Sequence, residues 1–241
     1  MSSFAPETIF HIGSFPVTNT VLDTLLVDGI IIAGVFYLSK KISLIPKNPL
    51  QNLIEYVIET FYGLVESVTQ NAADKIFPYF MSFFLFILLV NWSSFIPGVG
   101  TLGIREHGEL IPLFRGGTSD LNMTLGLALI SFAATHALSI KTIGIKDYLS
   151  RYFSFNPINL YVGILEIVSE ITKIVSLSFR LFGNIFAGEV VLATMTSIFA
   201  FVVPLPFLML EVIVGLVQAL VFSMLTMVGM AILTTSHNES H

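Results

Sequence analysis

The chain has 241 residues, of which 54% are hydrophobic and 11% charged, and its mean hydropathy is +0.86. A soluble domain of this size needs more charge to cover its surface, so the composition excludes a water-soluble globular protein and makes lipid the solvent for most of the chain. The net charge of −5 without a basic run argues against nucleic acid as a partner, and the absence of cysteine excludes disulfides and thiolate metal sites.

The first apolar stretch predicts a membrane span over 21–39, preceded by an outer N-terminal segment over 1–20. No Lys or Arg occurs before Lys40, so a retained span is favoured over a cleaved signal peptide. Asp23 and Asp28 fall in the first turns of this span. We expect them at the membrane interface, because charge deep in the bilayer is costly.

Residues 51–72 predict a helix of another kind. Apolar residues recur there at intervals of three and four, whereas Glu55, Glu59 and Glu66 fall outside the apolar stripe. This pattern is typical of an amphipathic helix with an acidic outer face. We expect it to lie along the membrane or against a partner.

Two uncharged stretches predict a two-span hairpin over 76–142. Residues 76–96 and 121–140 contain no formal charge, and each is long enough to cross the ~30 Å hydrocarbon core as a helix. The connection between them is an outer loop over 97–119.

The last third of the chain, 157–235, predicts two long helices. Asn156 and Pro157 form a good helix start, and the next proline is Pro204. At 1.5 Å per residue the two stretches would be roughly 55 Å and 45 Å long, which exceeds the bilayer. We therefore expect a strongly tilted antiparallel hairpin.

The sequence thus predicts one membrane domain over 1–241, an all-α integral membrane protein with about five membrane-crossing helices and one amphipathic interfacial helix. Lys and Arg give its orientation, because they collect on the cytoplasmic side, or on the matrix or stroma side in an organelle. With five crossings the N-terminus is then outside and the C-terminus inside. Seven of the eleven mark that inner side: Lys40, Lys41, Lys47, Lys75, Lys141, Lys146 and Arg151.

The remaining cations lie elsewhere. Arg105 and Arg115 fall in the Gly-rich outer loop, where Glu106 and Glu109 offset them. Lys173 and Arg180 are the other two, and both lie inside the first long helix.

Ionisable residues in the two long helices form a polar track. Glu166, Glu170, Lys173 and Arg180 are spaced by four, three and seven residues and share one helical face, which Asn184 continues. Glu189 is about half a rotation away from Arg180. On the second long helix Glu211 and Gln218 lie two turns apart on a common face.

Arg180 suits a barrier in such a track. Its guanidinium stays charged at any biological pH, so it cannot relay a proton. No carboxylate of this chain lies one turn from Arg180, which points to a carboxylate on a partner as its counter-ion.

Structural roles remain open for some of these residues. Glu166 and Glu170 are equally consistent with pairing to Lys173 near the cytoplasmic end of the helix, and such pairing is favoured for Lys173 itself. His136 is the single histidine inside a predicted span. We expect it to be packed and hydrogen-bonded rather than a proton relay.

Three segments carry a resemblance to a known family. SLSFRLFGNIFAGE over 176–189 resembles the RLFGN-x-x-AGE motif of subunit a of F-type ATP synthases. GLVQALVFSMLT over 215–226 is similar to the glutamine-bearing segment of that family, and SDLNMTLGLAL over 119–129 to its third shared block. The likeness spans nearly the whole chain.

The resemblance implies roles for individual residues. Arg180 would face the rotor-ring carboxylate, with Asn184 beside it and Gln218 opposite to orient it. Further matches would line the ion path or open the fourth helix: Glu189 and Glu211 toward the outer half-channel, Glu166 toward the inner one, and Asp120, Asn122 and Thr124 at the fourth helix. As a hypothesis of mechanism, we also place Glu170 at the inner half-channel beside Glu166.

The family also implies a function. The chain would be the stator subunit that passes protons, with Na⁺ as the alternative, through two offset half-channels to the c-ring and so couples ion flow to ATP synthesis. Its partners would be the c-ring rotor subunits, the peripheral-stalk b subunits and lipid. It would lie in the bacterial plasma (inner) membrane or, alternatively, in an energy-transducing organelle membrane. It would have no catalytic site, cofactor or metal, and the sequence contains no P-loop.

Two other classes have less support. A self-contained secondary transporter would show paired repeats, and we find no second copy of the RLFGN region. An intramembrane enzyme would need a catalytic motif, and neither H-E-x-x-H nor G-x-S-x-G occurs.

Overall fold

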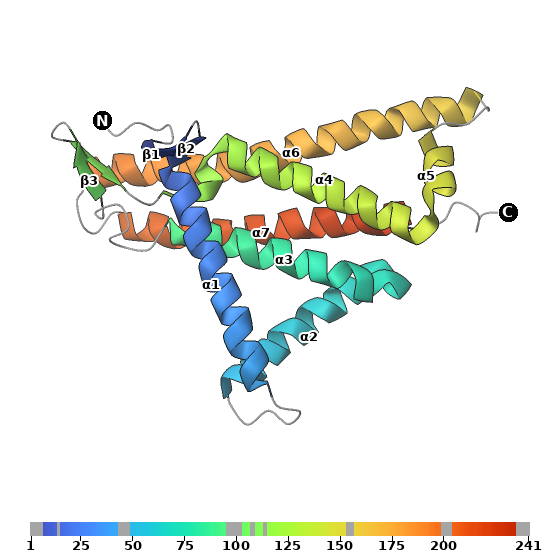
Figure 1. Ribbon diagram of the computed structural model, residues 1–241, viewed down its shortest axis with the longest axis horizontal. Coiled ribbons are helices and arrows are strands. Elements are labelled where there is room, and N and C mark those ends of the chain that lie inside the picture. The colour runs from blue at the N-terminus through green and yellow to red at the C-terminus, as the bar shows by residue number, and fades with distance from the viewer. Residues whose placement is uncertain are drawn as a thin grey trace. The chain divides into compact units, whose positions relative to one another are not determined.

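The computed structural model describes residues 7–13, 15–42, 49–94, 103–106, 109–112, 115–152, 157–198 and 204–234 (Figure 1). Asn156, the expected cap of the first long helix, lies outside these residues. The side chains of Arg105, Glu106 and Glu109 are likewise outside the description, so their expected charge balance stays a prediction.

The described chain is mainly helical, as the sequence predicts. Its α-helices are α1 (Asn19–Lys41), α2 (Pro49–Thr69), α3 (Ala73–Ser93), α4 (Leu121–Ile143), α5 (Ile145–Tyr152), α6 (Pro157–Ile198) and α7 (Pro204–Thr234). Two 3₁₀ turns are η1 (Gln70–Ala72) and η3 (Gly117–Ser119).

Three short features were not predicted. Strands β1 (Thr8–Ile12) and β2 (Phe15–Thr18) form an antiparallel hairpin before α1, and β3 (Gly103–Glu106) and β4 (Glu109–Pro112) form another in the loop between α3 and α4. The third is α5, which directly follows α4.

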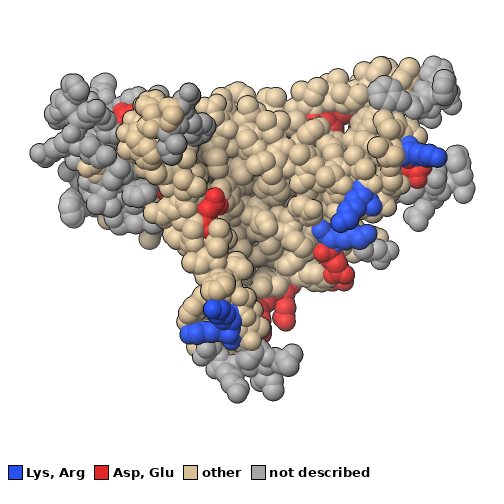
Figure 2. Space-filling model, in the orientation of Figure 1, with Lys and Arg blue, Asp and Glu red and all other residues tan. Residues whose placement is uncertain are grey.

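Four helices in the described part are long and apolar enough to cross a membrane, namely α1, α3, α4 and α7. Figure 2 agrees, since most of the visible surface carries neither acidic nor basic side chains. The chain is therefore a membrane protein. A further crossing by the 42-residue α6, and the tilt of α6 and α7, stay predictions.

Local sequence explains several helix ends. The Asp120 side chain accepts a hydrogen bond from the backbone N–H of Asn122 at 2.9 Å and so caps α4. Gly144 lies between α4 and α5 with φ +86°, a conformation that a residue without Cβ adopts at little cost. Pro157 and Pro204 stand at the first positions of α6 and α7, where a missing N–H costs no helical bond.

The chain divides into two compact units. The first comprises Met1–Ile42, Phe83–Thr124 and Phe179–Leu220, and the second Ser43–Ser82, Leu125–Ser178 and Val221–His241. Helices α3, α4, α6 and α7 each contribute residues to both units.

Polar side chains of α3 contact the backbone of α7 within the first unit. Asn91 Nδ2 donates to the Gly215 carbonyl at 2.9 Å, and Trp92 Nε1 donates to the Val212 carbonyl at 3.1 Å. Asn91 is fully buried. These bonds satisfy groups that would be costly to bury unpaired, and they set the register of α3 against α7 beside Glu211.

In the second unit, α4 and α7 are joined by buried hydroxyl groups. Ser131 and Thr226 share a hydrogen bond of 2.7 Å, and Ser139 donates to the Leu233 carbonyl at 2.6 Å. Short helix α5 lies against α6 at Gly163, where any Cβ would overlap with the Tyr152 carbonyl.

Helix α2, also in the second unit, follows its predicted pattern in part, since Ile58 and Val68 of the apolar stripe are exposed and Glu55 is half-buried. Val65 is fully buried and Phe61 half-buried, whereas Glu59 and Glu66 are exposed.

Candidate functional site

Glu189 on α6 forms an ion pair within the first unit. Arg115 Nη2 lies 3.5 Å from Glu189 Oε2, and Arg115 Nε also donates to Ser119 Oγ at 3.3 Å. The two charged side chains are 12% and 21% exposed, so the pair is well shielded from water. Arg115 thus pairs with an acid of the long helix. From the sequence, only Glu106 and Glu109 of the loop are expected to offset its charge.

Glu211 on α7 is the second acid of this site. It is 6% exposed, and its Oε2 has no hydrogen-bond partner among the described residues. Its carboxyl group lies against Gly188, the residue before Glu189, so closely that a Cβ on Gly188 would overlap with it. Glu189 is near enough to Glu211 to interact with it electrostatically. The two acids therefore form a coupled pair.

Asp23 on α1 is a third acid in the first unit. It is 2% exposed, and Ser93 Oγ donates to its Oδ2 at 2.7 Å. It also interacts electrostatically with Glu189. The sequence predicts Asp23 at the membrane interface and does not predict that its side chain is buried. A rule that flags every acid within an apolar run, as applied to Glu189, would have identified it.

A chain of buried neutral groups accompanies these acids. Thr118 Oγ1 donates to Asn91 Oδ1 at 2.7 Å, and Asn91 continues to the Gly215 carbonyl. The site thus brings together the carboxylates of Asp23, Glu189 and Glu211, the guanidinium of Arg115 and hydrogen-bonding side chains in a shielded setting. Such a site can hold and exchange a proton or a small cation.

The second unit contains a separate group of ionisable residues. Glu166 on α6 pairs with Arg151 on α5, whose Nε lies 3.2 Å from Glu166 Oε1. Arg151 Nη2 also donates to the Ile232 carbonyl at 3.2 Å. Glu166 therefore pairs across helices with Arg151, in place of the pairing with Lys173 that the spacing allowed.

Glu170 lies between two basic groups. Lys173 Nζ donates to its Oε1 at 2.6 Å, and His136 Nε2 lies 3.9 Å from its Oε2. The Lys173 contact is the local i, i+3 pair that the structural alternative predicted. His136 is hydrogen-bonded as expected, since its Nδ1 shares a bond of 2.7 Å with Tyr148 Oη.

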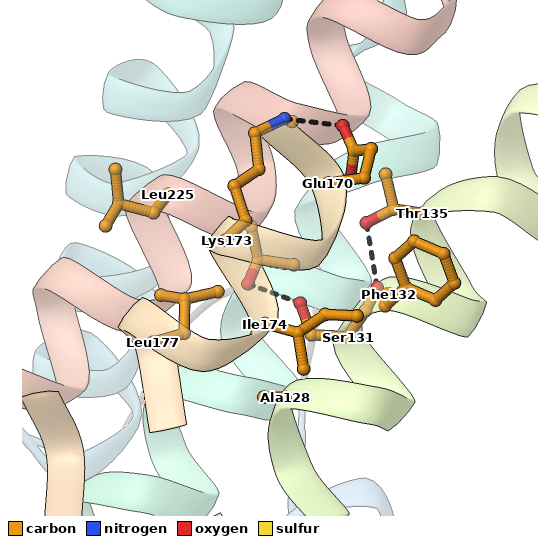
Figure 3. Close-up of a pocket in the computed structure, with 11 residues that line it drawn as sticks. Ala128, Ser131, Phe132, Thr135, Glu170, Lys173, Ile174, Leu177 and Leu225 are labelled. Atoms are coloured by element: carbon orange, nitrogen blue, oxygen red, sulfur yellow. Dashed lines mark hydrogen bonds and ion pairs between the residues drawn. The ribbon is translucent and has the colours of Figure 1, made fainter. Parts of the chain in front are cut away.

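A small cavity opens beside Glu170 and Lys173 (Figure 3). It offers about 30 Å³ to the centres of water molecules, and one water needs roughly 10–15 Å³. Ser131, Thr135 and Thr226 contribute hydroxyl groups to its lining. It has room and polar partners for water.

The other predicted residues are found at separate places. Arg180 and Asn184 are exposed on α6, and Gln218 is half-buried on α7. Asp120 caps α4 and Asn122 is exposed, so the first of these has a clear structural role. Sequence reasoning missed Asp23, Arg115, Arg151 and Tyr148 as members of the two groups, and for Tyr148 we see no sequence signal that would have found it.

Comparison with known proteins gives a consistent result. A family model described as ATP synthase A chain matches residues 21–230. ATP synthase subunit a of Moorella thermoacetica is 32% identical over 237 residues, which cover 98% of this chain and 100% of that protein. ATP synthase subunit a 2 of Pelobacter propionicus is 33% identical over 225 residues, 93% of this chain and 90% of that protein. The sodium ion specific subunit a of Propionigenium modestum is 33% identical over 230 residues, 93% of this chain and 77% of that protein.

Proposed function

The chain belongs to the ATP synthase subunit a family, and from this premise we propose that it forms two offset half-channels for protons beside the c-ring. It is an ion-translocating subunit of the Fo sector rather than a catalytic subunit. In the proposal, proton flow through the half-channels turns the ring and drives ATP synthesis in another part of the complex.

The observation that supports this proposal most is the pair of shielded carboxylate groups, one in each unit. Glu189 and Glu211 belong to the first unit and Glu166 and Glu170 to the second. Arg180 lies between the two sets in the sequence of α6. Two half-channels require two such acid groups, one for proton entry and one for proton exit.

The first group is assigned to the outer half-channel. Protons enter beside Glu189 and Glu211, which exchange them with the ring carboxylate. Glu211 suits this exchange because its Oε2 has no hydrogen-bond partner among the described residues and is free to take a proton. Arg115 holds Glu189 in place by charge.

The second group is assigned to the inner half-channel. Protons leave beside Glu166 and Glu170, and a cavity with room for water adjoins Glu170. Both acids have cationic partners, Arg151 and Lys173.

Arg180 is proposed as the barrier between the half-channels. Its permanent charge repels a proton that would otherwise cross directly, and it favours ionisation of the ring carboxylate that faces it. Asn184 would lie beside Arg180, and Gln218 would orient it. Asp120 and Asn122 would stabilise the first turn of α4. One elementary charge moved through 100 mV is worth about 2.3 kcal/mol, so several protons are needed for each nucleotide.

The partners proposed are the c-ring rotor subunits and the peripheral-stalk b subunits. Helix α6 offers an apolar face for a neighbour in lipid, because Tyr161, Val168 and Ile171 are all more than half exposed. The proposed location is the bacterial plasma membrane, with an energy-transducing organelle membrane as the alternative. The sodium ion specific relative makes Na⁺ the other ion to test.

A cysteine crosslink tests the proposal directly. The chain has no cysteine, so Asn184→Cys introduces a single thiol one turn from Arg180. In the assembled complex it should crosslink to a cysteine placed beside the carboxylate of a c subunit and stop rotation. Ala193→Cys is the matched control, because residue 193 is exposed on α6 but about half a rotation away. Crosslinking by the control alone, or by neither thiol, would reject the proposal.

A further inference from the structure

His136 on α4 is ionisable, faces the second unit's acids and has no role in the function proposed so far. Its Nδ1 is occupied by Tyr148 Oη at 2.7 Å. Its Nε2 is buried, and no hydrogen bond to it is found in the described part of the chain. The nearest acidic atom is Glu170 Oε2, at 3.9 Å. A buried ring nitrogen that faces a carboxylate is placed to exchange a proton with it.

The charged and titratable groups around His136 come from two other helices. Helix α6 contributes Glu166, Glu170 and Lys173, and α5 contributes Tyr148, Arg151 and Tyr152. The part of α7 in this unit, 221–234, contains no Asp, Glu, Lys, Arg or His. Since Arg151 pairs with Glu166 and Lys173 with Glu170, the formal charges cancel and His136 is the base left over.

Tyr148 decides which ring nitrogen is the base. A neutral imidazole carries one proton, and if Nδ1 donates it to Tyr148 Oη, the lone pair remains on Nε2 and faces Glu170. The ring is also held by aromatic contacts, with Phe132 at 4.0 Å and Tyr148 at 5.8 Å between centroids. Tyr148 is therefore a positioning residue for His136.

Glu170 can share a proton with this nitrogen without giving up Lys173. Its Oε1 receives the Lys173 bond, which leaves Oε2 on the side of His136. A rotation of the carboxylate shortens the 3.9 Å separation to a hydrogen bond. One added proton then resides either on Oε2 or on Nε2, and no other group has to change its charge.

A cavity with room for water adjoins the Glu170 side of the pair. It is lined by side chains of α4, α6 and α7, among them Thr135, Glu170 and Lys173 (Figure 3). Tyr148 is half-exposed on α5. Tyr152 next to it is buried, which raises the pKa of its hydroxyl group well above the ordinary value and keeps it neutral.

We propose that His136 and Glu170 form a shared one-proton acceptor in the inner half-channel, with Tyr148 as its positioning residue. A water in the cavity transfers a proton to the pair, and the pair returns it to water on the inner side in the direction of synthesis; in pumping the order is reversed. No bond other than O–H and N–H forms or breaks. This inference rests on the proposed function. It also means that the inner half-channel conducts protons, because Na⁺ prefers oxygen ligands to imidazole nitrogen.

The test measures ATP-driven proton pumping by the intact complex in inverted membrane vesicles, where the inner side faces the bath. The rate is divided by the ATPase activity of the same preparation with an uncoupler at each bath pH, so that the pH response of catalysis cancels. His136→Gln and Glu170→Gln should each lower this ratio by roughly tenfold. In each variant the pumping ratio should also depend less steeply on bath pH than in the wild type. The double variant should equal the single ones, because both remove the same proton site.

Control variants make the result specific. Ser139→Ala removes another buried polar group of α4, one that bonds to Leu233 rather than to the pair, and should leave the pumping ratio unchanged. Tyr148→Phe retains the ring but removes the hydroxyl group, and should shift the bath-pH profile without preventing assembly. If His136→Gln fails to assemble, Tyr148→Phe decides, and an unchanged profile overturns the inference.

Other outcomes overturn it as well. The first is a wild-type pumping ratio in His136→Gln. The second is a pumping ratio in the double variant that falls by the product of the two single losses. The third is ion flux in the wild-type complex that requires Na⁺ at constant pH. Arg180→Ala separates this inference from the function on which it rests. Coupled pumping by Arg180→Ala would reject the two half-channels altogether, whereas loss of coupling there with normal pumping by His136→Gln would reject the shared acceptor alone.

Discussion

Arg115 and Glu189 join the segment before α4 to α6, with Nη2 of the arginine 3.5 Å from Oε2 of the acid. Both side chains are shielded, and Ser119 fixes the guanidinium from the other side. An acid that is central to the proposed ion path is thus held by a loop that lies outside the predicted spans.

Arg115→Ala should destabilise the assembled complex. A shielded carboxylate that loses its partner costs about 3–5 kcal/mol, so thermal inactivation of the solubilised complex should shift to clearly lower temperature. Arg115→Lys should recover part of this loss, because an ammonium retains the charge but not the forked geometry. Equal stability of Arg115→Ala and the wild type would mean that water, and not Arg115, stabilises Glu189.

Gly188→Ala should impair ion flow through its effect on Glu211. An added Cβ would overlap with the Glu211 carboxyl group, which must then move from its place next to Glu189. In a helix interior the same change is otherwise favourable by up to about 1 kcal/mol, so a loss of proton pumping can be assigned to the overlap.

Two further variants test that assignment. Gly29→Ala in α1 has no atom within 4 Å of the added Cβ and should pump at the wild-type rate. Glu211→Asp shortens the acid by one methylene and should restore pumping in combination with Gly188→Ala. A Gly188→Ala complex as active as Gly29→Ala would contradict the close packing.

Much of the helical framework could be predicted, because apolar runs and prolines are local signals. Pro157 and Pro204 do begin the two long helices, and α3 and α4 occupy the two uncharged stretches. The hairpins and α5 were missed, since short elements in loops lack a long periodic pattern.

The site was predictable only in part, for a physical reason. Spacing along one helix identified Glu189 and Glu170 as unusual, because a charge in an apolar run is costly wherever it lies. The partners Arg115 and His136 are distant in sequence from the acids they face. Such pairings depend on how helices pack, and one sequence carries no direct signal of that.

Glu211→Gln should slow proton flow while leaving assembly intact. The amide has nearly the same shape, and Oε2 of the native acid makes no hydrogen bond within the described residues, so little packing is lost. It cannot exchange a proton, however, and general acid–base contributions are typically 10²- to 10⁴-fold. Pumping should therefore fall by at least about tenfold. The yield of complex that copurifies with its c-ring should stay unchanged. A parallel loss of yield and pumping would identify Glu211 as a structural carboxylate.

Arg180→Ala should abolish coupled ATP synthesis. Without a fixed cation between the outer and inner acids, a proton no longer has to travel with the ring, and the ring carboxylate facing the stator has no charge that favours its ionisation. ATP synthesis driven by an imposed proton gradient measures this loss directly.

Arg180→Lys should not restore coupled synthesis, because a lysine ammonium in a poorly solvated place can lose its proton and become a relay. Lys173→Ala removes the other cation of the same helix. It should slow proton flow, because Lys173 pairs with Glu170 in the inner half-channel, but the protons that still flow should stay coupled to synthesis. Normal synthesis by Arg180→Ala would remove the barrier from the mechanism and with it the need for two separate half-channels.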